Sequence, residues 1–322
     1  MKRHPNSPII TRRHIHMADA SLHDLTSVFN PGAIYHEGQI HMLLRIQDRG
    51  RRTHLVKALS HDGVSFQAEK QVFPITGLEA FPHHIYHIYD PRIVRIEDSF
   101  YITCSVDCET GCLVAIFKSS DLESMHYIST LNEAQHRNGV LFDEKIAGRY
   151  WMLSRPNEIT GSDGVKSGDR IFAYSSADLH TWQEEGLIME GRFHFWDELI
   201  GPGPPPFRTT LGWMLIYHGV ATHFGGGGIY QAGVCLLDSD NPSKLLARGD
   251  LNVLEPREIF ETTGQVPNVV FPTACIPVRS QSDGTLAGND PLFVYYGAAD
   301  TCIGLAITSP RELVEKSNIT LP

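Results

Sequence analysis

Short apolar runs alternate with polar turns along the whole chain, and the same three-part pattern recurs five times. Each repeat begins at a polar or Pro/Gly-marked position, crosses a run rich in aromatic and aliphatic residues, and returns through a third short run. The middle runs cover residues 39–45, 99–103, 149–155, 212–218 and 292–296. Runs of this length bounded by turn residues predict strands, so each repeat predicts a small antiparallel sheet.

A strand repeat of this size predicts the blade of a β-propeller, because blades span roughly 40–50 residues. One small sheet cannot bury both faces alone, so blades pack face to face around an axis. Five repeats therefore predict an all-β chain, a single five-bladed β-propeller domain over residues 1–322, with residues 1–26 as a lead-in. Unrelated hairpins of a β-sandwich are the alternative. Ile9 and Ile10 are the candidate closing strand, and residues 310–315 the one predicted helical turn.

Composition argues against several classes of partner. The 322 residues are 42% hydrophobic, enough for a large core, and the net charge of −10 without a basic run argues against nucleic acid. No apolar stretch approaches the roughly 18 residues needed to cross a bilayer, so no membrane is expected. The basic start has no apolar segment after it, so we expect no signal peptide and a cytoplasmic location.

The cysteines and histidines do not form a metal-binding pattern. Cys104, Cys108 and Cys112 are evenly spaced, but a zinc site would need a fourth ligand and usually has closer pairs. Reduced thiols are the expected state in the cytoplasm. We therefore predict no metal and no cofactor.

Polar residues gather where the strands of different repeats begin or end. The first strands begin near Asn30, Asp90, Arg92, Arg137 and Asn138, the second strands end in Arg45, Arg155 and His218, and Asp48 and Asp300 lie just beyond. Each has a structural alternative as a turn residue, an ion pair or a core histidine. Their equivalent positions instead predict one central funnel, because inner strands of blades converge on the axis. Carboxylates accept hydrogen bonds from sugar hydroxyls and arginine grips phosphate, so a polyhydroxylated or anionic ligand is predicted.

These residues resemble glycoside hydrolase family 130, the β-mannoside phosphorylases and their hydrolytic relatives. The matching phrases run from about Asn30 to Ile307 and include Tyr89-Asp90-Pro91-Arg92, Arg137-Asn138-Gly139, Leu153-Ser154-Arg155-Pro156, Tyr217-His218-Gly219 and Gly297-Ala298-Ala299-Asp300. The family fold is a five-bladed β-propeller, which agrees with the number of repeats.

The resemblance implies a role for most of these residues. Asp90 matches the general acid, Arg137, Arg155 and His218 match positions that hold inorganic phosphate, and Asn30, Arg45 and Asp300 match the mannosyl subsite; Asp48, Arg92 and Asn138 are further sugar-binding candidates. In such enzymes phosphate attacks the anomeric carbon with inversion, and the acid protonates the leaving oxygen through a sugar hydroxyl. The implied reaction is cleavage of short β-mannoside oligosaccharides by phosphate, giving α-mannose 1-phosphate.

One segment departs from the family pattern. Phosphorylases of the family usually carry a lysine just before the Ile-Gly of the fourth repeat, whereas Asp197-Glu198-Leu199-Ile200-Gly201 has none. An inverting β-mannosidase with Glu198 or Asp197 as the base is therefore the alternative. A sugar-binding propeller without catalysis is the third hypothesis. The linkage, the acceptor sugar (expected on the loops 67–89 and 221–229) and the formation of a homo-oligomer stay open.

Overall fold

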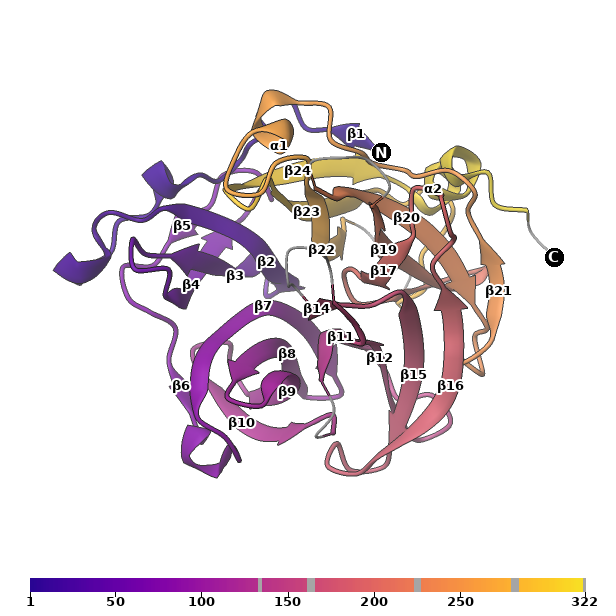
Figure 1. Cartoon of the computed structure of the whole chain (residues 1–322), viewed down its shortest axis with the longest axis horizontal. Helices are drawn as coiled ribbons and strands as arrows, with labels where there is room; N and C mark the ends of the chain where they lie inside the picture. The colour runs from indigo at the N-terminus through magenta and orange to yellow at the C-terminus, as the bar shows by residue number, and fades with distance from the viewer. Residues whose placement is uncertain (133–134, 161–165, 223–226, 279–283, 321–322) are drawn as a thin grey trace.

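Five antiparallel sheets are arranged around a central axis in the computed structural model, which confirms the predicted five-bladed β-propeller (Figure 1). The structure describes residues 1–132, 135–160, 166–222, 227–278 and 284–320. The innermost strands of the five blades are β2, β7, β11, β17 and β22, which meet near the axis.

The blades are formed in chain order, each starting from its inner strand. Blade one is β2 (Ser27–His36), β3 (Gln39–Gln47), β4 (Thr53–Ser60) and β5 (Gln67–Ala68). Blade two is β7 (Ile85–Ile96), β8 (Ser99–Cys108), β9 (Gly111–Ser119) and β10 (Met125–Thr130), with β6 (Ile75–Thr76) parallel to β10. Blade three is β11 (His136–Leu141), β12 (Tyr150–Pro156), β15 (Arg170–Ser176) and β16 (Trp182–Glu190).

The last two blades complete the ring. Blade four is β17 (Leu199–Pro202), β19 (Gly212–Ala221), β20 (Ile229–Leu237) and β21 (Leu245–Arg248), with β18 (Phe207–Thr209) also paired to β19. Blade five is β22 (Val270–Pro277), β23 (Leu292–Ala298), β24 (Cys302–Thr308) and β1 (Lys2–Arg3). A separate hairpin of β13 (Ile159–Thr160) and β14 (Lys166–Ser167) extends from blade three.

Helices play a small part in this fold. The α-helices are α1 (Ile259–Thr262) and α2 (Pro310–Ser317), and α2 contains the predicted helical turn. The described residues also form three short 3-10 turns, η1 (Arg12–His14), η2 (Ala20–Leu22) and η3 (Leu78–Ala80). Within the described ranges, no helix has the length and apolar character that a bilayer span requires.

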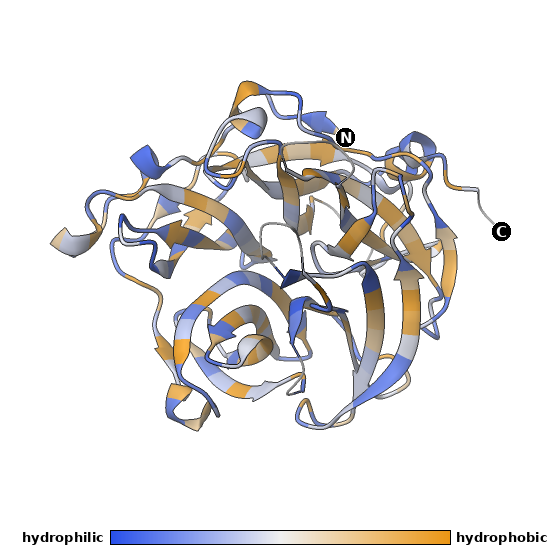
Figure 2. Ribbon diagram, in the orientation of Figure 1, coloured by the Kyte–Doolittle hydropathy of each residue, from blue (hydrophilic) through white to orange (hydrophobic). Residues whose placement is uncertain are grey.

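Each boundary between neighbouring blades holds its own apolar core, as face-to-face packing of sheets requires. Pairs of buried side chains from the five boundaries illustrate this: Leu43 with Ile102, Ile116 with Met152, Leu153 with Leu215, Val234 with Val294, and Leu305 with Val28. Hydrophobic residues recur along the strands of the blades (Figure 2). Burying such side chains contributes about 1.5–3 kcal/mol each, so the blade boundaries supply most of the stability.

The N-terminus closes the ring, but not through the predicted pair Ile9 and Ile10. Lys2 and Arg3 form β1 and pair with β24, whereas Ile10 makes only an isolated bridge to Ile303. A strand of two residues has no hydrophobic periodicity, so the sequence pattern does not predict it.

A buried carboxylate fixes this closure. Glu261 on α1 is fully buried and accepts hydrogen bonds from Arg3 Nε at 2.6 Å and Nη2 at 2.7 Å. Burial raises the pKa of Glu261, but the hydrogen bonds from Arg3 and from the backbone of Arg257 and Glu258 outweigh it, so the pKa is lowered. The contribution of these bonds to the free energy of unfolding is therefore complete above about pH 4.3, the usual pKa of a glutamate. It is lost as the pH falls through the lowered pKa of Glu261.

We expect Arg3→Met to lower the free energy of unfolding by about 3 kcal/mol, because it leaves a buried carboxylate without its cation. Urea denaturation at pH 7 measures this change. The matched control is Arg49→Met, whose side chain is 78% exposed beside Asp24 and should change stability by less than about 1 kcal/mol. Equal effects of the two substitutions would contradict the closure described above.

Candidate active site

The inner strands of blades one, two and three share a bulge that turns a polar side chain toward the axis. Asn30, Asp90 and Asn138 adopt left-handed backbone angles, with φ of 44°, 53° and 58°, and the strand register shifts at each of them. Asn and Asp tolerate this conformation better than most residues. Because a bulge re-aims a side chain that would otherwise follow the pleat, the local sequence directs all three side chains into one space.

That space is a cavity of about 380 Å³ at the axis. Its lining brings together Asp90, the three predicted phosphate ligands Arg137, Arg155 and His218, and four predicted sugar ligands, Asn30, Arg45, Asn138 and Asp300. Tyr89, Asp107, Lys166, Tyr230 and Phe271 are among the other lining residues. One cavity thus holds a carboxylate acid candidate and a group of cations.

Asp90 lies on the side of the cavity formed by blades one and two. Its Oδ1 accepts hydrogen bonds from Arg45 Nη1 at 2.7 Å and from Asn30 Nδ2 at 3.0 Å. The Arg45 guanidinium lies between the rings of Phe29 and Tyr89, at 4.3 and 4.4 Å from their centroids. Cation–π contacts on both faces hold the guanidinium in place, so Arg45 fixes the orientation of the Asp90 carboxylate.

Asp300 adds a second carboxylate close to the first. Burial raises its pKa to about 6; the charge of Arg45 opposes this shift and that of Asp90 adds to it. Near neutral pH this side of the cavity therefore holds two carboxylates and one arginine, a set suited to the hydroxyl groups of a sugar.

The part of the cavity around Arg137 and Arg155 carries more positive charge than the described carboxylates neutralise. Arg155 is buried and donates Nη2 to Asn157 Oδ1 at 3.0 Å, and no described carboxylate forms an ion pair with it. Burial, with the nearby charge of Arg137, lowers the pKa of Arg155 to about 10. Nε of Arg155 and Nε of Arg137 are buried without a hydrogen-bond partner in the described chain. Buried unpaired charge is costly, so this geometry favours an anionic ligand.

His218 lies beside these arginines as a neutral ring. Burial, followed by the charges of Arg155 and Arg92, lowers the pKa of His218 well below its usual range. Its ring is 4.6 Å from that of Phe271. A Cβ on Gly201 would lie 2.5 Å from His218 Cε1, so a larger residue at position 201 would collide with the imidazole ring. His218 thus offers hydrogen bonding rather than charge to a ligand.

The structure gives Arg92 a different role from the predicted sugar ligand. Its guanidinium is buried outside the lining of the cavity and donates Nε to the carbonyl of Gly203 at 2.9 Å and Nη1 to that of Asp90 at 2.7 Å. Arg92 therefore ties blade two to blade four beneath the site.

Three predicted carboxylates also lie outside the lining of the cavity. Asp48 accepts hydrogen bonds from the backbone and side chain of Arg52 in the turn after β3. Asp197 is buried under Arg192 and Arg248, and Glu198 accepts the backbone N–H groups of His194 and Thr222. Each carboxylate serves a local turn or ion pair.

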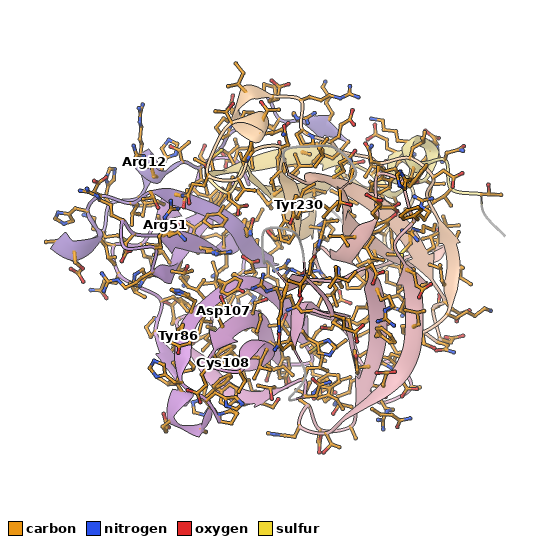
Figure 3. The ribbon with its side chains drawn as sticks, viewed as in Figure 1. Arg12, Arg51, Tyr86, Asp107, Cys108 and Tyr230 are labelled. Atoms are coloured by element: carbon orange, nitrogen blue, oxygen red, sulfur yellow. The ribbon has the colours of Figure 1, made fainter. Side chains whose placement is uncertain are left out.

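Asp107 is the clearest residue that the sequence pattern misses. Its Oδ1 accepts from Tyr89 Oη at 2.8 Å and lies 3.4 Å from Arg137 Nη2. Figure 3 labels Asp107, on blade two, and Tyr230, on blade four. In blades one and three, an arginine on the second strand lies opposite the residue that precedes the bulge: Arg45 in blade one and Arg155 in blade three. In blade two the equivalent position on the second strand is Ser105. Asp107 lies two residues after Ser105, on the same face of the strand. A search for polar residues at the ends of the second strands would therefore find Asp107 if it were extended by two residues.

Residues 223–226 of the predicted acceptor loop 221–229 lie outside the described residues. Among the described residues, no group of His, Cys, Asp and Glu could hold a metal ion, and the six cysteines are free.

Comparison with known proteins finds enzymes that are similar to this chain over most of its length. A family model described as beta-1,4-mannooligosaccharide phosphorylase matches residues 1–318. The chain is 30% identical to a beta-1,4-mannooligosaccharide phosphorylase of Ruminococcus albus over 97% of its own length and 89% of that protein. It is also 30% identical to a 1,2-beta-oligomannan phosphorylase of a Thermoanaerobacter species, covering 89% of this chain and 91% of that one.

Solved structures show the same fold. The beta-1,2-mannobiose phosphorylase of Listeria innocua, in complex with beta-1,2-mannobiose, superposes with a TM-score of 0.82 at 22% identity. The superposition covers 98% of this chain and 99% of that one.

We expect the stability of an Asp300→Asn variant, relative to the unchanged protein, to rise between pH 4 and pH 7. The unfolded carboxyl ionises near pH 3.9 and the folded one near 6, so ionisation of Asp300 destabilises the fold as the pH rises. The gain at pH 7 should be roughly 3 kcal/mol, measured by thermal unfolding across this range. Asp98→Asn, at a fully exposed carboxyl, is the control. A pH-independent difference would contradict the raised pKa.

Proposed function

The chain belongs to glycoside hydrolase family 130, and from this premise we propose that it cleaves β-mannosidic bonds with inorganic phosphate, releasing α-mannose 1-phosphate. The substrates are short oligosaccharides that end in β-mannose. The nucleophile is phosphate, which acts as a co-substrate and not as a cofactor.

The observation that carries this proposal is the pair Arg137 and Arg155 in the same cavity as Asp90. Asp107 lies 3.4 Å from Arg137 Nη2 and no described carboxylate forms an ion pair with Arg155, so the two arginines leave net positive charge in a buried space. A neutral sugar does not offset that charge, whereas a phosphate dianion does. The cavity is therefore suited to hold a sugar on the side of Asp90 and Arg45 and an anion on the side of Arg155 and His218.

This division of the cavity fits an inverting reaction. A phosphate oxygen held by Arg137 and Arg155 forms a bond to the anomeric carbon while the bond to the leaving sugar breaks on the opposite face. Asp90 supplies the proton that the leaving oxygen needs, relayed through a sugar hydroxyl, and the proton lost by the attacking hydrogen phosphate restores the acid. The arginines stabilise negative charge throughout the transfer, and electrostatic stabilisation of this kind usually lowers an enzymatic barrier more than any other single effect.

The alternative of hydrolysis needs a carboxylate that activates water. Asp197 and Glu198, the predicted bases, lie outside the lining of the cavity and are engaged by Arg192, Arg248 and backbone N–H groups. The alternative of a binding protein without catalysis does not explain why an acid and an anion site share one cavity. Phosphorolysis is therefore the function that the geometry supports best.

We expect the protein to cleave β-1,2- or β-1,4-mannobiose only when phosphate is present. Incubation with each disaccharide, with and without phosphate, followed by ³¹P NMR, should show α-mannose 1-phosphate with one linkage preferred. Release of free mannose at equal rates in both buffers would instead indicate a hydrolase. No cleavage of either disaccharide or of longer β-mannosides would favour a binding protein.

We expect Asp90→Asn to reduce turnover by about 10²–10⁴-fold, because an amide cannot donate the proton of the acid. Initial rates of mannose 1-phosphate formation measure this loss, and calorimetric titration with mannobiose should show that the variant still binds sugar. Asp98→Asn, at the exposed turn between β7 and β8, should leave the rate unchanged. Full activity of the Asp90 variant would remove Asp90 from the mechanism.

A further inference from the structure

One lysine reaches the central cavity, and it comes from the hairpin that extends from blade three. Lys166 in β14 lines the cavity together with Arg137 and Arg155. It also lines an adjoining pocket that shares Asp107 and Arg137 with the cavity. Lys166 therefore lies at the rim, on the same side as the two arginines.

The position of the Lys166 ammonium is set by an amide. Its Nζ donates a hydrogen bond to Gln135 Oε1 at 3.0 Å, and Gln135 Nε2 in turn donates to the carbonyl of Thr110 at 2.9 Å. Gly111 lets this amide approach, since a Cβ there would come within 2.5 Å of Gln135 Cδ. In the part of the chain that the structure describes, no carboxylate forms an ion pair with Lys166. Its charge is thus oriented but not neutralised.

The backbone next to Lys166 is packed against the arginine deeper in the site. A Cβ on Gly168 would lie 2.0 Å from the carbonyl oxygen of Pro156 and 3.1 Å from Arg155 Cγ. The carbonyl of Gly168 also accepts the N–H of Ile200 at 3.3 Å. The chain directly after β14 therefore packs closely against Arg155, two residues from Lys166.

The charge balance of the anion site supports a third cation. Arg137 and Arg155 with Asp107 leave one net positive charge, and His218 is neutral. Free phosphate carries between one and two negative charges near pH 7, with a second pKa of about 6–7. Lys166 would bring the site to two positive charges and so match the charge of the phosphate dianion.

We propose that Lys166 is a phosphate-binding residue of this protein, placed at the rim of the cavity by Gln135. This inference rests on the proposed phosphorolysis. In the proposed complex, Arg155 and Arg137 bind the phosphate inside the cavity, and Lys166 binds a phosphate oxygen that points toward the rim. Lys166 either gives up its hydrogen bond to Gln135 or keeps it and uses another of its N–H donors. An ammonium has three donors, so it can bind phosphate while keeping the amide as a partner.

The test compares Lys166→Met with Lys145→Met, a lysine paired to Glu97 outside the cavity. We expect Lys166→Met to raise the KM for phosphate roughly tenfold, with little change in the KM for the mannoside, and Lys166→Arg to restore most of the affinity. The phosphate-induced rise in Tm without sugar should shrink in Lys166→Met and not in Lys145→Met, which gives a readout independent of turnover.

Each outcome decides the matter. A phosphate KM and a phosphate-induced Tm shift that both stay within twofold of the unchanged protein would overturn the role of Lys166, even if phosphorolysis is confirmed. Equal rises in both substrates' KM values would indicate a structural role of the hairpin and also overturn it. If the unchanged protein shows no phosphate-dependent cleavage, the proposed function itself fails, and phosphate binding by the two variants still tests the site.

Discussion

The site depends on one backbone constraint, the left-handed bulge within the inner strands of blades one, two and three. Regular strands would send alternate side chains into the blade boundaries on either side, and no set of polar groups would share the axis. The bulges at Asn30, Asp90 and Asn138 break that alternation at the same level in three blades. Backbone conformations of this kind persist only where surrounding structure enforces them.

Hydrogen bonds between blades enforce these conformations. Thr103 Oγ1 donates to the carbonyl of Gly139 at 2.6 Å, and Thr273 Oγ1 donates to that of Pro31 at 2.6 Å. Each carbonyl belongs to a residue directly after a bulge, in the neighbouring blade. Arg92 adds a third tie, from blade two to blade four. The inner ring is thus held by bonds that cross blade boundaries, which explains why these polar residues are buried although they lie outside the lining of the cavity.

The sequence predicts the features that repeat and misses those that occur once. Five apolar runs predict the second strands of the blades, β3, β8, β12, β19 and β23, because burial on both faces of a blade requires them, and Asp90, Arg137 and Arg155 follow from equivalent places in these repeats. The outer strands are exposed on one side, as in β16, where polar residues interrupt the apolar pattern. The closing strand β1 is fixed by a contact between Arg3 and Glu261, 258 residues apart, and no local pattern encodes such a contact.

The fourth blade shows how a missing cation and the fold are related. The segment that in family phosphorylases carries a lysine here carries Asp197, whose carboxylate is held by Arg192 at 2.9 Å, Arg248 at 2.5 Å and Tyr217 Oη at 2.8 Å. These three donors hold the Asp197 carboxylate inside blade four. The segment therefore connects β17, β19 and β21 and does not contribute a side chain to the cavity. The proposed phosphate site, however, needs positive charge near Arg155, and a side chain from any blade that borders the cavity can supply it. A hairpin on blade three is such a source, because Gly168 allows its backbone to rest on Arg155. On this argument, the charge near Arg155 matters more for the anion site of this propeller than which strand carries the cation.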